Sequence, residues 1–302
     1  MLSIIVCSKN IFPEKNFSEN IKNTIGIEYE IVHIDNSNNQ YSIFEAYNIG
    51  IERSKFEHLC FLHDDVCFVT QNWGGNIITH LSTPNIGLIG IAGGNLVCKV
   101  PSGWFALDEF MNIIQSDKDN NSVKKHILKP IKLDKNSVSV VAIDGVLMCA
   151  RKEIFKSIKF DNSFHGFHGY DIDISLQVFN AGYSNYVIYD VLIEHKSKGN
   201  MNKEYYLQMM EIHKKWDENL PVFERNYPLE KQKEVIIKVH KERLKKLRKY
   251  LIRAHFSVNE SAKIIDFYAR KIGLSSFNNL VFSLPVQLFF IRLFSKWRRK
   301  MQ

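Results

Sequence analysis

The sequence is poor in cysteine and has no paired cysteine motif. Its five cysteines are scattered over 302 residues, mostly in apolar runs, which favours buried free thiols over disulfides or a zinc site. An apolar run of the about 20 residues that a spanning helix needs is also lacking, since the best candidate, Asn278–Ile291, is interrupted by Pro285 and Gln287. No basic leader follows Met1. We therefore predict neither a transmembrane segment nor a secretion signal, and expect a cytoplasmic protein.

Charge is unevenly distributed along the chain. Hydrophobic residues make up 45% and charged residues 24%, a balance typical of globular proteins, so wholesale disorder is excluded. Residues 1–229 contain 22 Lys+Arg and 27 Asp+Glu, whereas residues 230–302 contain 18 and 5. This asymmetry predicts two parts, an enzyme or binding domain at residues 1–225 and a basic helical extension at residues 226–302.

The first third of the chain reads as a βαβ unit. Three short apolar runs are predicted strands: Ser3–Ser8, Tyr29–Ile34 and Glu57–Leu62. A helix is predicted over Ser42–Ser54, where apolar residues recur at helical spacing and Ser42 forms a capping box with Glu45. Strand, helix and strand at this spacing indicate an α/β fold with a largely parallel sheet.

The remaining elements are predicted from the same patterns. Strands are expected at Ile86–Ile91, Ser137–Ala150 and Asn185–Val191, and helices at Asp171–Ala181 and Lys203–Asn219. The polar, lysine-rich segment Asn112–Asn136 is expected to be a loop.

Polar residues follow each of the first three predicted strands. They are Ser8, then Asp35 and Asn36, and then His63, Asp64 and Asp65. Ligands of open α/β sheets bind outside the carboxyl ends of strands, so these residues form a candidate binding site. Polar turns also end strands that bind nothing, and this alternative stays open.

Four stretches in this order resemble family 2 glycosyltransferases with a GT-A fold, above all a glycosyltransferase-like subgroup related to streptomycin-biosynthesis proteins. They are Ile31–Ser37, Ala46–Gly50, Phe61–Val66 and Gly166–Asp173, the last followed by Ala181–Tyr183 and Ile193–His195. The likeness covers residues 1–220. It implies a GT-A, Rossmann-like domain with a mostly parallel central sheet flanked by helices, and the basic C-terminal extension lies outside it.

The resemblance places Phe61–Val66 at the D-x-D motif of the family. Such enzymes use Mn²⁺ or Mg²⁺ to neutralise the departing diphosphate, and carboxylate oxygens are the preferred ligands. The first motif position holds His63, so Asp65 is the expected metal ligand, with Asp64 near the metal or the ribose. The resemblance also implies that His195 completes the metal or diphosphate site. A solvated turn is the alternative reading of Asp64 and Asp65.

Donor contacts are expected from residues at the strand ends. The resemblance implies that Asp35 contacts uracil or ribose, with Asn36 beside it and Ser8 in the same pocket. His63, Asp64 and Asp65 complete this donor-binding set. Taken alone, Asp-Asn-Ser is typical of a turn.

The resemblance assigns the catalytic base to Asp171, which would take the proton of the acceptor hydroxyl. The family has Glu before this Asp, and here the residue is Tyr170. Asp171 and Asp173 also open a predicted helix, where acidic residues complement the helix dipole, so one of them can serve only that purpose.

The acceptor side is expected around the aromatic, glycine-rich segment that precedes Asp171. The candidates are His168, Gly169, Tyr170 and Asp173, and the resemblance adds Asp144 and Gly145, for which structural hydrogen bonding is the alternative. Aromatic faces stack on sugar rings and glycines permit tight turns, but packing against the sheet would explain the same residues.

The basic extension contains two amphipathic segments. Glu230–Arg253 and Leu284–Lys300 combine Lys and Arg with apolar residues near helical spacing, which suits an anionic membrane surface at the inner face of the cell membrane. Docking on the acidic domain, or contact between copies in a homo-oligomer, are the alternatives. No nucleic-acid-binding motif is evident.

The leading hypothesis is a metal-assisted, inverting glycosyltransferase that moves a sugar from a nucleotide donor, with UDP favoured by resemblance, to a glycan or lipid-linked acceptor. Its expected setting is surface polysaccharide or lipo-oligosaccharide assembly. One alternative is a nucleotidyltransferase, although Ser8–Pro13 lacks a glycine- and lysine-rich triphosphate loop. The other is a sugar- or membrane-binding module with a degenerate site, as the departures at His63 and Tyr170 would suit.

Overall fold

The computed structural model describes residues 1–116, 124–130, 136–197, 199 and 201–274. The predicted membrane segment Leu284–Lys300 and the apolar run Asn278–Ile291 lie outside these residues. Within the described part of the chain, no helix is both long and apolar enough to cross a membrane.

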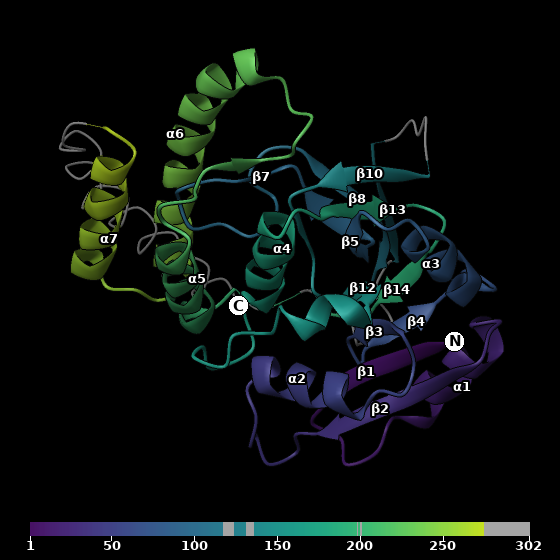
Figure 1. The fold of residues 1–302 in the computed structure, drawn as a ribbon. Coiled ribbons are helices and arrows are strands. Elements are labelled where there is room, and N and C mark those ends of the chain that lie inside the picture. The colour runs from purple at the N-terminus through teal and green to yellow at the C-terminus, as the bar shows by residue number, and fades with distance from the viewer. Residues whose placement is uncertain (117–123, 131–135, 198, 200, 275–302) are drawn as a thin grey trace.

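The main sheet has seven strands in the order β10-β13-β5-β12-β3-β1-β2 (Figure 1). Strands β2, β1, β3, β5 and β13 run parallel, and β12 and β10 run antiparallel to their neighbours. The predicted α/β fold with a mostly parallel central sheet is therefore confirmed. The strands span Leu2–Ser8 (β1), Tyr29–Asp35 (β2), His58–Leu62 (β3), Ile86–Gly90 (β5), Ser137–Val140 (β10), Leu147–Arg151 (β12) and Ser184–Ile188 (β13).

A second sheet has the order β11-β6-β8-β14-β4, and β9 pairs with β8. Its strands are Val66–Phe68 (β4), Ala92–Gly94 (β6), Glu109–Gln115 (β8), Lys125–Lys129 (β9), Ala142–Ile143 (β11) and Ile193–His195 (β14). Strands β7 (Leu96–Val97) and β15 (Val222–Phe223) form a separate antiparallel pair.

The predicted loop at Asn112–Asn136 is wrong for its described part. Strands β8 and β9 form an antiparallel hairpin there, in which Ile113 faces Ile127. Both isoleucines are partly or fully shielded from solvent, because the hairpin joins the second sheet. The polar composition of the segment hid the short apolar stretches that form these two strands.

The predicted helices are confirmed, with shifted ends. The Ser42 hydroxyl accepts a hydrogen bond from the Glu45 backbone amide, and the Glu45 carboxylate accepts one from the Ser42 backbone amide, which is the expected capping box. The helices α1, α3 and α7 were not predicted individually. The helices span Lys15–Thr24 (α1), Ile43–Arg53 (α2), Trp73–Leu81 (α3), Tyr170–Asn180 (α4), Lys203–Lys215 (α5), Leu229–Arg253 (α6) and Val258–Lys271 (α7), with a 3-10 turn at Lys152–Lys156.

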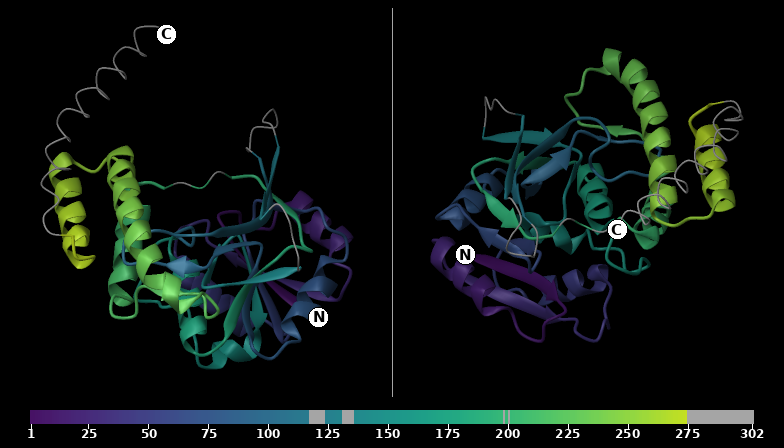
Figure 2. Two further views of the ribbon diagram at one scale, coloured as in Figure 1. Left: turned by 90° about the horizontal axis from the view of Figure 1, so that it is seen from above. Right: turned by 180° about the vertical axis from the view of Figure 1, so that it is seen from behind.

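Helices cover both faces of the main sheet. On one face, α2 and α4 contribute Phe44, Tyr47 and Ile174 to a core that includes Phe61 of β3. On the other face, α1 and α3 contribute residues such as Trp73. Figures 1 and 2 show α6 and α7 on the side of the molecule away from α1.

Helix α6 docks on the body of the protein through its apolar stripe. Val239, Leu244, Leu247 and Leu251 are buried in a third core, which also contains Leu96 of β7 and residues of α5 and α7. The predicted basic helix therefore exists, but its apolar stripe already has a protein partner.

Candidate active site

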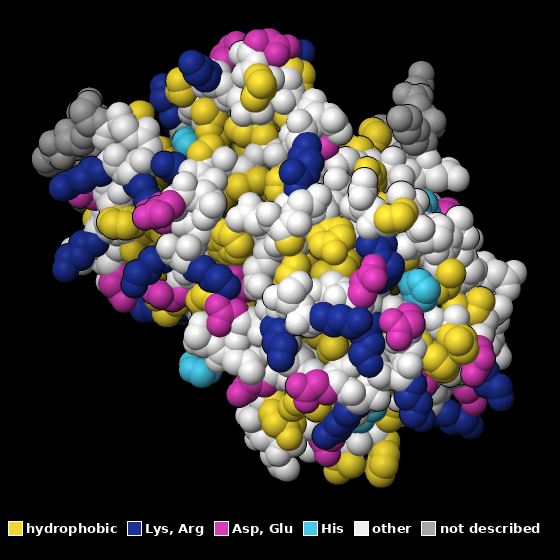
Figure 3. All heavy atoms as spheres, in the orientation of Figure 1, with side chains coloured by type: hydrophobic (Ala, Val, Ile, Leu, Met, Phe, Trp, Pro, Cys, Tyr) yellow, Lys and Arg dark blue, Asp and Glu magenta, His cyan; other side chains and the backbone are white. Residues whose placement is uncertain are grey.

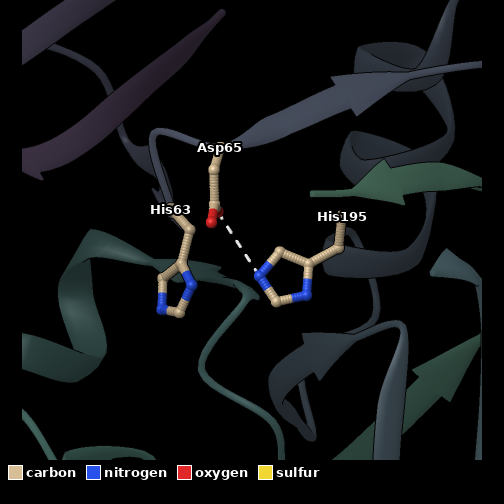
Figure 4. A group of neighbouring side chains, drawn as sticks. All are labelled: His63, Asp65 and His195. Atoms are coloured by element: carbon tan, nitrogen blue, oxygen red, sulfur yellow. Dashed lines mark ion pairs between the residues drawn. The ribbon is translucent and has the colours of Figure 1, made fainter. Parts of the chain in front are cut away.

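Three side chains with metal-binding chemistry meet beside the carboxyl end of β3. His63 and Asp65 lie in the connection between β3 and β4, and His195 ends β14 (Figure 4). The antiparallel register of β14 with β4 pairs His195 with Val66 and so brings it next to Asp65. One ligand atom from each residue lies within 4.8 Å of the others. We call this trio the His–Asp cluster.

The chemistry of the His–Asp cluster fits a divalent cation. Nε2 of His195 lies 3.3 Å from Oδ1 of Asp65. Burial lowers the pKa of His63, so its imidazole is neutral near pH 7, which is the form that binds metals. Two imidazoles and one carboxylate suit Mn²⁺ better than Mg²⁺, because Mg²⁺ prefers an all-oxygen set.

Asp64 points away from this cluster and toward the end of β1. The Ser8 hydroxyl donates a hydrogen bond to Oδ2 of Asp64 at 2.5 Å. The parallel register of β1 and β2 places Ser8 beside Asp35. Hydrogen bonds from Ser37 lower the pKa of Asp35, so this carboxylate is charged at neutral pH. Ser8, Asp35 and Asp64 are thus gathered at adjoining strand ends, as the sequence predicts.

Asn36 has a structural role, which revises its prediction as a donor contact. The side chain is 1% exposed. Its amide nitrogen donates to the Tyr41 carbonyl at 2.9 Å, and its carbonyl oxygen accepts from the Tyr41 amide at 3.0 Å. These bonds brace the turn that leads from β2 toward α2.

A cavity of about 460 Å³ joins the His–Asp cluster to the start of α4. His63, His195, Asp144 and Asp171 all contribute to its lining. Asp171 lies in the first turn of α4, and its Oδ1 accepts a hydrogen bond from the Ile172 amide at 2.9 Å. Burial, together with the negative charge of Asp144, raises the pKa of Asp171 to about 7. A carboxyl group with this pKa can exchange a proton near neutral pH.

Asp144 is held firmly in the cavity wall. Nε1 of Trp104 donates to one carboxylate oxygen at 2.7 Å, and the Val146 amide donates to the other at 2.9 Å. These two donors fix the position of the Asp144 carboxylate beside Asp171. Asp144 therefore lies in the predicted neighbourhood, and its direct structural effect is on the basicity of Asp171.

The other predicted acceptor-side residues divide between the cavity and its supports. His168 lines the cavity and packs edge-on against Tyr205, with 5.3 Å between ring centroids. Gly169 caps α4 with φ of 75°, a left-handed conformation that favours glycine. Gly145 and Tyr170 lie behind the lining, where Tyr170 is 5% exposed.

Asp173 lies away from the cavity lining, and its prediction as an acceptor contact is revised. The side chain is fully buried, and its carboxylate accepts from Nε1 of Trp216 and from Nε2 of Gln177, each at 2.8 Å. Nζ of Lys215 also lies 2.8 Å away. Asp173 therefore joins α4 to α5.

Several of the residues that line the cavity were not predicted from the sequence. Trp104 and Phe105 come from the segment after β7, and Tyr205 and Met209 come from one face of α5. The spacing of four between Tyr205 and Met209 indicates a shared helix face but not what that face meets. Gln115 of β8 also lines the cavity, and its side-chain Nε2 donates to the His195 carbonyl at 3.1 Å.

Helix α6 supports this wall from behind. Nε of Arg243 donates to the Ala106 carbonyl at 3.0 Å, and its guanidinium also bonds the Phe105 carbonyl. Because Phe105 lines the cavity, the C-terminal region takes part in shaping the site.

Residues 3–220 match the model of a family described as the glycosyltransferase-like family. The chain belongs to this glycosyltransferase-like family. The match includes the whole His–Asp cluster, Asp144 and Asp171, and it ends before α6. No curated protein sequence gives a significant match.

Two solved structures are similar to this chain at low sequence identity. GalNAc-T7 with UDP, GalNAc and Mn²⁺ is similar with a TM-score of 0.45 and 12% identity over 66% of this chain and 44% of that one. Protein A197 from STIV has a TM-score of 0.37 and 13% identity over 65% of this chain and 86% of that one. Neither likeness bears on the function of this chain.

Proposed function

We propose that the chain is a metal-assisted glycosyltransferase, which moves a sugar from a nucleotide-sugar donor to a hydroxyl group of a glycan or lipid-linked acceptor. The observation that carries this proposal is that His63 and His195 of the His–Asp cluster line the same cavity as Asp171. A site for a diphosphate-bound cation and a proton acceptor are the two features that such a transfer needs. Family membership supports the same reaction class.

His63, Asp65 and His195 are proposed to hold Mn²⁺, with Mg²⁺ as the weaker fit. When bound, the cation supplies Lewis-acid stabilisation of the nucleoside diphosphate leaving group. Ser8, Asp35 and Asp64 are proposed to contact the base and ribose of the donor. Their oxygens are gathered at the ends of β1, β2 and β3, which is where α/β sheets bind nucleotides.

Asp171 is proposed to take the proton of the acceptor hydroxyl at its carboxylate. A base must be ionised to act and basic enough to hold the proton, and a pKa of about 7 satisfies both conditions. Asp144 sustains this basicity because its negative charge disfavours ionisation of Asp171. The aromatic lining, including Trp104 and Phe167, offers faces on which an acceptor sugar can stack.

The finer assignments rest on the sequence resemblance. We propose UDP as the donor nucleotide, inversion at the transferred carbon, and a role in surface polysaccharide or lipo-oligosaccharide assembly. The relation to the streptomycin-biosynthesis subgroup belongs with these proposals. So does the division into a GT-A domain at residues 1–225 and an extension at residues 226–302.

We also propose that the extension attracts the protein to an anionic membrane surface at the cytoplasmic face. The side of α6 opposite the buried stripe also carries the acidic residues Glu234 and Glu242. Seven exposed basic residues are spaced along this side: Lys231, Lys238, Lys241, Lys245, Lys246, Lys249 and Arg253. Figure 3 shows further Lys and Arg side chains over α5 and α7, interspersed with acidic groups. With its apolar stripe buried, α6 would act by charge alone.

The deciding experiment is thermal-shift binding of UDP, GDP, CMP and dTDP sugars, each with and without Mn²⁺. A ligand present at 100 times its Kd stabilises the folded protein by about 2.7 kcal/mol. We expect one nucleotide class to give a shift that requires Mn²⁺ and disappears in Asp65→Ala.

The matched control is Asp190→Ala, because Asp190 pairs with His80 at 3.0 Å in the same kind of His–Asp contact. It should keep the Mn²⁺-dependent shift. A folded wild-type protein that responds to none of the nucleotide sugars would contradict the transferase and favour the binding module.

A further inference from the structure

His63 and Tyr170 stand where the resemblance leads us to expect Asp and Glu, and they contact each other. Nε2 of His63 lies 2.8 Å from the Tyr170 hydroxyl. They are 107 positions apart in sequence, one after β3 and the other at the start of α4. The contact is shielded from solvent, since Tyr170 is 5% exposed.

The direction of this hydrogen bond follows from the second partner of Tyr170. The Tyr170 hydroxyl also lies 3.2 Å from the Gly145 carbonyl oxygen, which can only accept. Tyr170 has a single proton and donates it to Gly145, so it accepts from His63. Nε2 of His63 therefore carries the ring proton, and the lone pair is on Nδ1. Figure 4 shows Nδ1 on the side of the ring that faces Asp65 and His195.

The position of the Tyr170 hydroxyl depends on the glycine at position 145, which has no side chain. A Cβ at Gly145 would lie 2.2 Å from the hydroxyl oxygen and 2.5 Å from Cζ of Tyr170, far inside contact distance. Phe44 and Tyr47 hold the ring edge-on from the other side, with centroids 6.3 and 5.4 Å away. The hydroxyl is thus held in a slot that opens onto His63.

We propose that Tyr170 is a positioning residue that holds His63 in its Nε2–H tautomer and presents Nδ1 to a divalent cation in the His–Asp cluster. This inference rests on the metal site of the proposed function. A carboxylate has two equivalent oxygens and no tautomers, whereas an imidazole binds metal through the one nitrogen that lacks a proton. A histidine at position 63 therefore needs an outer partner, and Tyr170 supplies it.

The test removes the hydroxyl and keeps the ring. In Tyr170→Phe, Mn²⁺ affinity measured by calorimetry should fall by roughly 10–100-fold, the usual effect of losing an outer hydrogen bond to a metal-binding histidine. The ¹⁵N-histidine NMR spectrum of the metal-free protein should show Nε2–H at His63 in the wild type and a mixture of tautomers in the variant.

Two comparisons separate positioning from a general structural effect. Tyr189→Phe removes another shielded hydroxyl, which donates to the Lys129 carbonyl at 2.8 Å, and it should leave Mn²⁺ affinity unchanged. In a His63→Ala background, Tyr170→Phe should cause no further loss of affinity, because its effect passes through His63.

Three results would overturn the inference: an Nδ1–H tautomer at His63 in the wild type, unchanged Mn²⁺ affinity in Tyr170→Phe, or an equal loss in the His63→Ala background. Failure of the wild type to bind Mn²⁺ would instead overturn the metal site of the proposed function. The tautomer of the metal-free protein would then still decide the role of Tyr170.

Discussion

The cavity and the outer face of α6 use charge in opposite ways. In the cavity, carboxylates are shielded and held by fixed donors, and the pKa of Asp171 rises to about 7. On the outer face of α6, seven basic side chains extend into solvent, where charges interact weakly. Arg243 and Arg248 of the same helix are the exceptions, since both are buried, and Arg243 is bonded to the cavity wall. Proton transfer is therefore expected in the cavity, where burial brings the pKa of Asp171 near neutral pH. The exposed basic face of α6 can attract anionic partners only by its charge.

The largest expected effect is a loss of sugar transfer when the cavity is altered. Asp171→Asn removes the proposed base and should lower sugar transfer by about 10²–10⁴-fold, the usual contribution of a general base. Donor binding should persist, because the His–Asp cluster and the strand ends are untouched. Steady-state transfer and donor thermal shift together measure this.

Asp173→Asn is the matched control, two residues along the same helix. It weakens buried contacts to Trp216 and Lys215 and should reduce the free energy of unfolding by about 1–3 kcal/mol. Transfer per folded molecule should hardly change. Full transfer activity in Asp171→Asn would refute the assignment of the base.

The next effect concerns the buried side of α6. Leu247→Ala deletes a side chain that is 1% exposed in the third core, so the free energy of unfolding should fall by about 2–5 kcal/mol. Urea denaturation followed by circular dichroism measures this. Ile237→Ala, on the exposed side of the same helix, should cost far less. Equal small losses in both variants would mean that α6 is not docked in solution.

A smaller effect is expected on the outer face. Changing Lys238, Lys245 and Lys249 together to Gln should weaken binding to anionic vesicles by about 1 kcal/mol per lysine. Stability should stay within about 0.5 kcal/mol of the wild type. Vesicle co-sedimentation at low and high salt measures the binding.

A triple change of Lys22, Lys156 and Lys159 to Gln removes the same charge from exposed positions elsewhere. Vesicle binding that falls equally in both triples would show that net charge matters, rather than the face of α6.

The last prediction uses pH. Because the pKa of Asp171 is raised from 3.8 to about 7, the folded state holds this proton more tightly than the unfolded state. Its stabilising contribution is present below about pH 4 and is lost as pH rises to about 7. Asp171→Asn should therefore gain thermal stability relative to wild type between pH 5 and pH 8. A stability difference that does not vary with pH would argue against the raised pKa.

Local patterns sufficed to predict much of the main sheet and the helices α2 and α4 on one of its faces. The Ser42 capping box marked α2, and the polar residues after β1, β2 and β3 marked one edge of the sheet. Those signals are short-range, so a single sequence displays them. The β8–β9 hairpin was missed because its short apolar stretches lie among lysines and asparagines.

The fine division of labour in the site could not be read from spacing. Asp171 and Asp173 look alike in sequence, and only the packing of α5 buries Asp173 against Trp216. Asn36 looks like a ligand, yet the fold uses both ends of its amide in a turn. Trp104 carried no motif, and its bond to Asp144 depends on contacts between distant segments.

The His–Asp cluster is complete only when two segments that are distant in sequence have come together. His63 follows a strand of the main sheet, while His195 belongs to the second sheet and enters about 130 residues later. A nascent or truncated chain that has not yet paired β14 with β4 has only part of the cluster. Cation binding would therefore act as a cross-link between the two sheets, and its onset during refolding would report that β14 has paired with β4.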